Sequence, residues 1–297
     1  MLPEAHVKLA LALIWIAPGF WAVNYIVGRM APGVIDAHSL ALGRWTIACM
    51  VFSFVARAEL WREREHLLRD WRQHFVLGAL GMVICGAWVY VGAQTTVAMN
   101  IALIYMAGPI LIASGAALWL GERMRPSQML GVALALAGVA HVVFKGQWHR
   151  LGEFRLLAGD GWILAATVSW AAYSLLQKKW PNPLSATARL AVISGAGSIL
   201  LLPFAIWESV GPRALPWTLP ALNMVLAVAL IPGVGAYWVH GWSQRILGAS
   251  RVAVALYLSP LYAAVGAWLV LNEPLGAHHL VGAALILPGV LLVARAK

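Results

Sequence analysis

Charged residues, prolines and glycines divide this chain of 297 residues into ten apolar runs, each about 17 to 24 residues long. An α-helix needs about 20 apolar residues to cross a hydrocarbon layer of about 30 Å. The strands of a membrane barrel are about half that length and alternate in polarity, and these runs do not alternate. The sequence therefore predicts an all-α integral membrane protein with ten transmembrane helices, at about residues 9–28, 39–56, 75–94, 99–120, 128–144, 161–177, 187–207, 219–242, 250–271 and 277–294.

The composition excludes an ordinary soluble domain. Only 11% of the residues are charged and 62% are hydrophobic, whereas about a quarter of the residues in a soluble domain are charged. The formal net charge of +10 comes from basic residues in the connections between apolar runs, where they set orientation, and we expect no nucleic-acid partner. Cys49 and Cys85 fall inside apolar runs, which argues against a disulfide framework or a zinc site. We expect no cofactor.

The segment 109–142 is repeated 151 positions later as the segment 260–293. In both copies a proline opens an apolar run and a glutamate closes it, a coincidence that apolar composition alone rarely produces. The chain is therefore a duplication, and we place its first half at residues 1–148 and its second half at residues 149–297. The matched positions include Pro109 with Pro260, Ala113 with Ala264, Gly115 with Gly266, Glu122 with Glu273, Gly131 with Gly282 and Gly138 with Gly289.

Lysine and arginine residues are distributed unequally on the two sides of the predicted spans. When successive connections are assigned alternately to two sides, 15 basic residues lie on the side of both termini and 5 on the other, with Arg44 inside a span. The positive-inside rule then predicts cytoplasmic termini in a multi-pass protein of the cell inner membrane. Because each half has five spans, the second half enters from the opposite side. An inverted repeat of this kind is a known way to build a transport site between two halves.

The starts of the two halves also match, at an offset of 149, where Trp21-Ala22 corresponds to Trp170-Ala171. An aromatic residue followed by small residues in span one, a mid-depth proline in spans four and nine, and the glutamates of "GER" and "NEP" resemble the EamA family of the drug/metabolite transporter superfamily. The resemblance covers essentially the whole chain. The stretch 170–173 is also similar to the corresponding stretch of an aromatic amino-acid exporter in that family. The resemblance implies an inner-membrane exporter in which two inverted five-helix repeats surround a central cavity.

Polar and aromatic side chains at mid-depth are the candidates for lining that cavity. Hydrogen bonding between helices would explain each polar group singly, and core packing or lipid contact would explain each tryptophan. Together they describe an aromatic pocket with scattered hydrogen-bond groups, which suits amphipathic metabolites such as aromatic amino acids. The predicted cavity residues are Trp21, Asn24, Tyr25, Trp88, Gln94, Tyr105, Pro109, Trp170, Tyr173, His240, Tyr257 and Pro260.

Pro109 and Pro260 each remove a helix hydrogen bond near the middle of a predicted span. A simple kink would explain either proline alone. Because they recur in both halves, we prefer a paired hinge, or an unwound point of substrate contact, that faces the shared cavity.

Charged groups inside the spans are few. All eleven acidic residues fall at span ends or in loops, so the sequence places no carboxylate at mid-depth as a proton relay would favour. His240 is the candidate proton carrier, with a neutral, hydrogen-bonded side chain as the alternative. Arg44 could attract carboxylate groups, snorkel outward or form a structural pair. The sequence has no Walker A motif, which leaves a gradient as the energy source.

These features favour a secondary or facilitative transporter that exports amino acids and related small metabolites from the cytoplasm by alternating access. A membrane-embedded enzyme or a lipid-handling protein using the same cavity would need clustered catalytic polar residues facing one leaflet, and the polar residues here are scattered. A channel would need a continuous polar stripe on pore-facing helices. We therefore expect no enzymatic activity, a small-molecule substrate, a lipid bilayer around the protein, and a monomer or weak oligomer.

Overall fold

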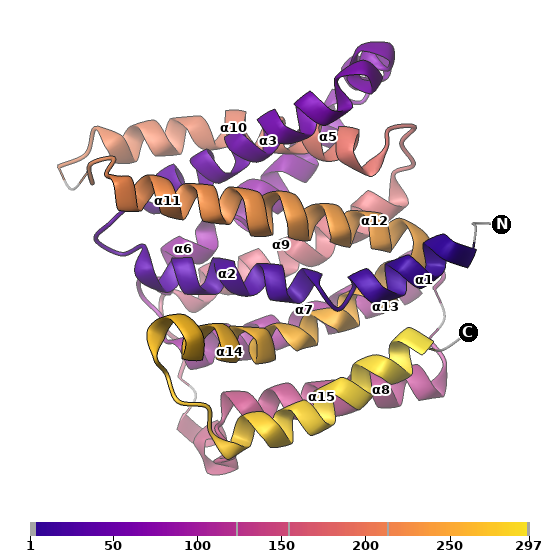
Figure 1. The fold of residues 1–297 in the computed structure, drawn as a ribbon, viewed down its shortest axis with the longest axis vertical. Helices are drawn as coiled ribbons and strands as arrows, with labels where there is room; N and C mark the ends of the chain where they lie inside the picture. Colours follow the sequence, from indigo (N-terminus) through magenta and orange to yellow (C-terminus); the bar gives the residue numbers. More distant parts are fainter. Residues whose placement is uncertain (1–3, 123, 154, 213, 296–297) are drawn as a thin grey trace.

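The computed structural model describes residues 4–122, 124–153, 155–212 and 214–295, and every regular element in these ranges is helical. The long helices lie side by side along one direction, and the first described helix begins at the same end of the bundle where the last one finishes (Figure 1). We call that end the terminal face and the other end the opposite face. A chain that starts and finishes at one face has crossed the bundle an even number of times.

The five crossings of the first half coincide with the first five predicted spans. A short helix, α4 (Arg64–Arg69), follows the second crossing. The crossings are formed in order by α1 (Glu4–Leu13) with α2 (Ala17–Met30), by α3 (Ala37–Arg62), by α5 (Trp71–Gly78) with the π-helix η1 (Ala79–Ile84) and α6 (Trp88–Ala93), by α7 (Ala98–Trp119), and by α8 (Pro126–Val143).

The second half follows a short 3-10 helix, η2 (Trp148–Glu153), and repeats the pattern. Its crossings coincide with the remaining five predicted spans. They are formed in order by α9 (Asp160–Lys179), by α10 (Ala186–Ser209), by α11 (Leu219–Val228) with the π-helix η3 (Ala229–Ala236) and α12 (Tyr237–Leu247), by α13 (Ala249–Ala255) with the 3-10 helix η4 (Leu256–Leu258) and α14 (Ser259–Leu271), and by α15 (Ala277–Arg295).

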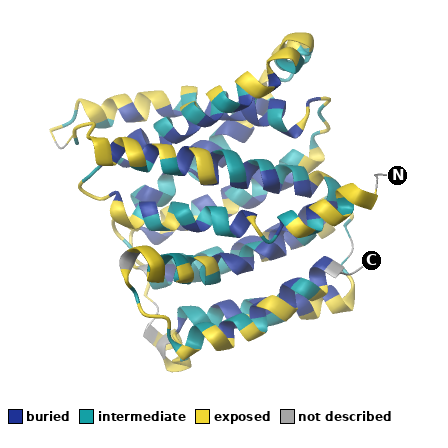
Figure 2. Cartoon of the chain, in the orientation of Figure 1, coloured by how far each residue is buried: buried dark blue, intermediate teal, exposed yellow. Residues whose placement is uncertain are grey.

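Nine of these crossings are long and apolar enough to span a membrane, counted over the described residues. The tenth is α9, which has 20 residues but is more polar, with buried Ser169, Tyr173 and Ser174. It packs between α6 and α7 and contacts η1, so neighbouring helices cover its polar positions. Figure 2 shows buried residues where helices face one another and exposed residues on the outer surfaces. A polar helix in the interior agrees with the cost of exposing polar groups to lipid.

Helix interruptions follow the prolines only in part. The first crossing is interrupted between α1 and α2, just before Pro18, and the ninth changes to 3-10 geometry just before Pro260. By contrast, α7 continues as an α-helix through Pro109. Of the two alternatives expected at the paired prolines, a hinge or an unwound point, the helix is not unwound at Pro109, because the remaining backbone hydrogen bonds of α7 hold it together. The two π-helices η1 and η3 lie at corresponding places in the third and eighth crossings.

The contact between α8 and α15 shows how the halves are related. A side chain at Gly131 would lie 2.5 Å from the carbonyl oxygen of Gly289, and one at Gly138 would lie 2.9 Å from that of Gly282. The offset of 151 maps the first pair onto the second, so each pair is the image of the other. Such reciprocal contacts define a two-fold relation, and the pairing of 131 with 289 and of 138 with 282 makes the helices antiparallel. The repeat is inverted, as the sequence predicted.

The ends of α7 and α14 show the same relation at the level of the backbone. Gly121 and Asn272 both have positive φ, of 70° and 56°. The next residue, Glu122 or Glu273, donates its N–H to the carbonyl of Ala116 or Ala267, at 3.1 and 3.2 Å. This six-residue closure is the Schellman ending of a helix. The repeated "GER" and "NEP" patterns therefore place one glutamate directly beyond each helix, on opposite faces of the bundle.

The glycine crossing can be tested by adding a single methyl group. Gly131→Ala places a methyl group against the backbone of α15, and we expect it to lower the free energy of unfolding by about 1–3 kcal/mol because the helices must separate. Gly241→Ala in α12 is the matched control, since nothing lies within 4 Å of its new methyl group. Thermal unfolding in detergent measures both. Equal stability of the two variants would contradict the close crossing.

Candidate functional site

Trp21 of α2 and Trp170 of α9 meet in the middle of the bundle. Their ring centroids are 5.5 Å apart at an interplanar angle of 84°, which is the edge-to-face arrangement that aromatic pairs prefer. The offset of 149 relates these two residues, so each contacts its own repeat counterpart. Likewise, the Tyr257 hydroxyl donates to the carbonyl of Met106, 151 positions away, at 3.1 Å. The pseudo-two-fold axis that relates the two halves therefore passes close to both contacts.

Four further rings extend the tryptophan pair into what we call the aromatic cluster. Tyr237 and His240 lie on one face of α12, and their centroids are 5.9 and 5.3 Å from that of Trp21. Tyr173 lies one turn after Trp170 on α9 and stacks on it at 5.4 Å. Trp45 of α3 contacts Tyr237 at 4.8 Å. The aromatic cluster consists of Trp21, Trp45, Trp170, Tyr173, Tyr237 and His240.

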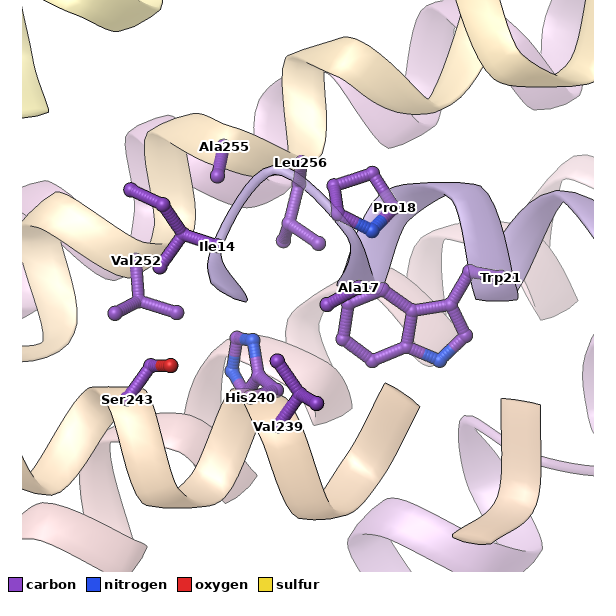
Figure 3. Close-up of a pocket in the computed structure, with 10 residues that line it drawn as sticks. All are labelled: Ile14, Ala17, Pro18, Trp21, Val239, His240, Ser243, Val252, Ala255 and Leu256. Atoms are coloured by element: carbon purple, nitrogen blue, oxygen red, sulfur yellow. The ribbon is translucent and has the colours of Figure 1, made fainter. Parts of the chain in front are cut away.

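The rings of the aromatic cluster pack closely against one another. A cavity beside it has a volume of about 10 Å³, measured as the space open to the centre of a water molecule, which is enough for one water molecule at most. Figure 3 shows the His240 ring and the Ser243 hydroxyl directed into it from α12, with Trp21 and Pro18 on the far wall. The interruption between α1 and α2 forms its edge. A molecule larger than water fits this cavity only if the surrounding side chains move apart.

Several polar atoms at the aromatic cluster have no hydrogen-bond partner in the described part of the chain. They are the Nε1 atom of Trp45, the Tyr173 hydroxyl, the Nε2 atom of His240 and the hydroxyl of Ser243, all buried. Leaving a buried polar atom without a partner costs about 1–3 kcal/mol. Two of these residues, His240 and Ser243, line the cavity, which marks it as a place where a ligand or water completes the hydrogen bonding.

Arg44 lies next to the aromatic cluster and is only 3% exposed, so it does not snorkel outward. Its guanidinium donates to the Asn24 side-chain oxygen at 3.0 Å, and the Tyr90 hydroxyl donates to the same oxygen at 2.6 Å. The guanidinium carbon lies 4.5 Å from the ring centroid of Trp45 and 5.6 Å from that of Tyr237. Cation–π contacts thus join Arg44 to the aromatic cluster.

The remaining predicted cavity residues lie at varying distances from the aromatic cluster. Tyr25 is 37% exposed and contacts Tyr105 at 6.4 Å. Trp88 contacts Trp162 at 5.0 Å and borders the same hydrophobic core as Trp170. Gln94 is exposed at the end of α6, so it does not lie at mid-depth as predicted.

The two prolines also differ in their surroundings. Pro109 is buried inside α7, and Pro260 is partly buried at the start of α14, beside η4. Their place in a substrate path remains an expectation.

The predicted set of cavity residues did not include Trp45, Tyr237 or Arg44, although Arg44 was a candidate for attracting carboxylate groups. Trp45 and Arg44 are neighbours on α3, and Tyr237 lies one turn before His240 on α12. The available signal was their position within apolar runs. It did not show which helix face each residue occupies, because uniformly apolar helices carry no periodic pattern to fix their rotation.

Two glutamates that correspond by the repeat, Glu122 and Glu273, have different binding partners at the two ends of the bundle. At the terminal face, Glu122 accepts hydrogen bonds from the N–H groups of Ala249 and Ser250, at 3.0 and 3.1 Å, and from the Ser250 hydroxyl at 2.8 Å. It therefore joins the end of α7 to the start of α13. At the opposite face, Glu273 forms an ion pair with Arg29 of α2 at 2.6 Å.

The architecture and the site define a multi-pass helical membrane protein with two inverted repeats and an aromatic centre. The chain belongs to the EamA-like transporter family, whose model matches residues 8–144 and 157–295. It is therefore a membrane transporter for small molecules.

Proteins of similar sequence are also described as transporters. The chain is 27% identical over 278 residues to the uncharacterized transporter YyaM of Bacillus subtilis, covering 92% of this chain and 89% of YyaM. It is 28% identical over 294 residues to a probable terminal-alkyne amino-acid exporter of Streptantibioticus cattleyicolor, covering 99% and 94%. A crystal structure of a protein at 19% identity superimposes with a TM-score of 0.76 over 96% of both chains, which shows a shared fold.

The unpaired Tyr173 hydroxyl gives a test of the site. Tyr173→Phe removes a buried hydroxyl without a partner in the described part of the chain, so we expect unchanged or slightly higher stability. In Tyr237→Phe, the matched control, a hydrogen bond to the Gly81 carbonyl at 3.2 Å is lost, and we expect a loss of about 1 kcal/mol. Thermal unfolding of both variants measures the difference. Equal losses would contradict an unpaired Tyr173.

Proposed function

We propose that this protein exports amino acids and related small amphipathic metabolites from the cytoplasm by alternating access, with the aromatic cluster as the substrate site. The two inverted halves would rock about the line through Trp21 and Trp170. The excess of basic residues supports a terminal face in the cytoplasm and a location in the inner membrane. Facilitated diffusion along a substrate gradient uses the same movement.

The observation that carries this proposal is that Glu122 and Glu273, which correspond by the repeat, have different binding partners. Each follows an equivalent helix ending, yet Glu122 binds the start of α13 while Glu273 pairs with Arg29. By the offset of 151, the counterpart of the α13 start is the start of α7, near Met99. An inverted-repeat protein in its other conformation exchanges the states of its halves. We infer that Glu273 then binds the start of α7, while Glu122 releases α13.

The chemistry of the aromatic cluster supports amphipathic substrates. Its tryptophan and tyrosine rings can stack on an aromatic or aliphatic side chain and attract an ammonium group through cation–π contact. The unpaired atoms of Tyr173 and His240 add hydrogen-bond capacity. The relative described as a probable terminal-alkyne amino-acid exporter is consistent with an amino acid as the substrate.

Flux from proteoliposomes tests the proposed function directly. Vesicles containing the purified protein and loaded with labelled tryptophan, phenylalanine or leucine should release at least one of them faster than empty vesicles do. Trp21→Ala and Trp170→Ala should each slow that release about tenfold, since each removes a ring that can stack on the substrate, and one such contact is worth about 0.5–1.5 kcal/mol. Release of none of a broad panel of amino acids would contradict the proposal.

The Glu122 contact yields a second prediction. Glu122→Gln removes the charge from three hydrogen bonds at the start of α13, and we expect amide exchange of Ala249 and Ser250 to accelerate about tenfold or more. Glu4→Gln is the matched control, because its ion pair with Lys8 is highly exposed and contributes little. Hydrogen exchange with mass spectrometry measures peptides from both regions. Equal protection in wild type and Glu122→Gln would contradict this role.

A further inference from the structure

Arg44 carries a positive charge into the interior of the bundle. It lies seven residues after the start of α3, which places it about 10 Å below the opposite face. It is 3% exposed, and its Nε atom has no hydrogen-bond partner in the described residues. Burying a charge is costly unless it is paired. An ionisable residue inside a membrane domain therefore indicates a functional site.

The neighbours of Arg44 orient the guanidinium without neutralising it. Arginine can only donate, so the side-chain oxygen of Asn24 must face it. The Tyr90 hydroxyl also donates to that oxygen. The three side chains of Arg44, Asn24 and Tyr90 together therefore have more donors than acceptors and a net positive charge. The stem of Arg44 lies against Gly233 of η3, where an added side chain would be 3.4 Å from its Cγ and 3.6 Å from its Nε. Gly233 of the π-helix thus packs directly against the side chain of Arg44, beside its unpaired Nε atom.

The described carboxylates that bind inside the bundle or at its ends are engaged elsewhere, so none of them balances this charge. Glu122 binds α13, Glu273 binds Arg29 and Glu208 binds His38. The others in this group are Asp36, which binds Leu215, Glu59, which binds Ser185, and Asp160, which binds Asn100 and Leu157.

We propose that Arg44 binds the carboxylate of the transported compound and makes this protein selective for carboxylate-bearing amphipathic substrates over the corresponding amines. This inference rests on the proposed transport function and names its substrate class. The cation–π contacts to Trp45 and Tyr237 place the guanidinium beside the aromatic cluster. A carboxylate at Arg44 leaves the rest of the substrate among the rings of Tyr237, Trp21 and Trp170. Asn24 and Tyr90 act as positioning residues, since they hold the guanidinium.

Three probes with the same indole ring separate the possible recognition groups. L-Tryptophan has both a carboxylate and an ammonium group, indole-3-propionate has only the carboxylate, and tryptamine has only the ammonium group. Their binding to the purified protein in detergent is measured by isothermal titration calorimetry, and their flux is measured in proteoliposomes. The variants are Arg44→Met, which keeps the bulk of the stem, Arg44→Lys, which keeps the charge, and Arg189→Met.

Arg189 is the matched control because it is another buried arginine, only 4% exposed, whose Nε atom also has no hydrogen-bond partner among the described residues. Its guanidinium donates to the backbone carbonyls of Gln177 and Trp180 at 2.7 and 3.1 Å, so its role is structural. We expect Arg189→Met to lower thermal stability and leave the preference among the three probes unchanged. We expect Arg44→Met to unfold at the wild-type temperature or higher, since it removes an uncompensated buried charge.

The expected result is that Arg44→Met weakens binding of tryptophan and indole-3-propionate about tenfold or more, with little change for tryptamine. Arg44→Lys should restore part of the lost affinity. Equal weakening of all three probes, or no weakening of any, would overturn the inference, and continued amino-acid flux would then leave the proposed function standing. Absence of flux from wild type, together with carboxylate-selective binding that depends on Arg44, would overturn the transport function and keep the binding site.

Discussion

A bilayer offers no hydrogen-bond partners in its hydrocarbon core, and this constraint shapes every part of the structure. The backbone satisfies it by folding into helices. Most buried side chains satisfy it by pairing, as Asn24 does with Tyr90 and Asp160 does with Asn100. The exceptions are therefore informative. Buried atoms of Tyr173, Ser243, His240 and Arg44 lack partners in the described part of the chain and lie at or next to the aromatic cluster, whereas other such atoms lie elsewhere, including those of Gln73 and His74 in α5.

Symmetry explains why the aromatic cluster lies at the centre of the bundle. The glycine crossing of α8 and α15 fixes the two halves against each other, and the pairs of Trp21 with Trp170 and of Tyr257 with Met106 lie near the same axis. In a structure with perfect symmetry, equivalent residues would make the same contacts at both faces. Here Glu122 holds the terminal face while Glu273 binds α2 instead. The difference between equivalent residues is what a protein with two alternating conformations requires.

Sequence patterns predicted the crossings and their inversion well, because apolar length, charge bias and repeated residues such as Pro109 and Pro260 are one-dimensional features. They also predicted Trp21 and Trp170 as a pair. They failed where helix rotation matters. Gln94 lies exposed at a helix end, whereas Trp45 and Tyr237, outside the predicted set, lie in the aromatic cluster. At Pro109 the helix continues, because one missing hydrogen bond does not open a helix whose neighbours support it.

The claim that the halves alternate is tested most directly by pulsed electron spin resonance on two symmetry-related label pairs, in a background without the two native cysteines. Labels at exposed Leu9 and Leu118 report on the terminal face, and labels at Ala158 and Leu269, their counterparts by the two offsets, report on the opposite face. When a transported amino acid is added, the account predicts that the distance between the labels at the terminal face lengthens. In the same molecules, the distance between the labels at the opposite face should shorten. Two distances that stay fixed, or that change in the same direction, would contradict it.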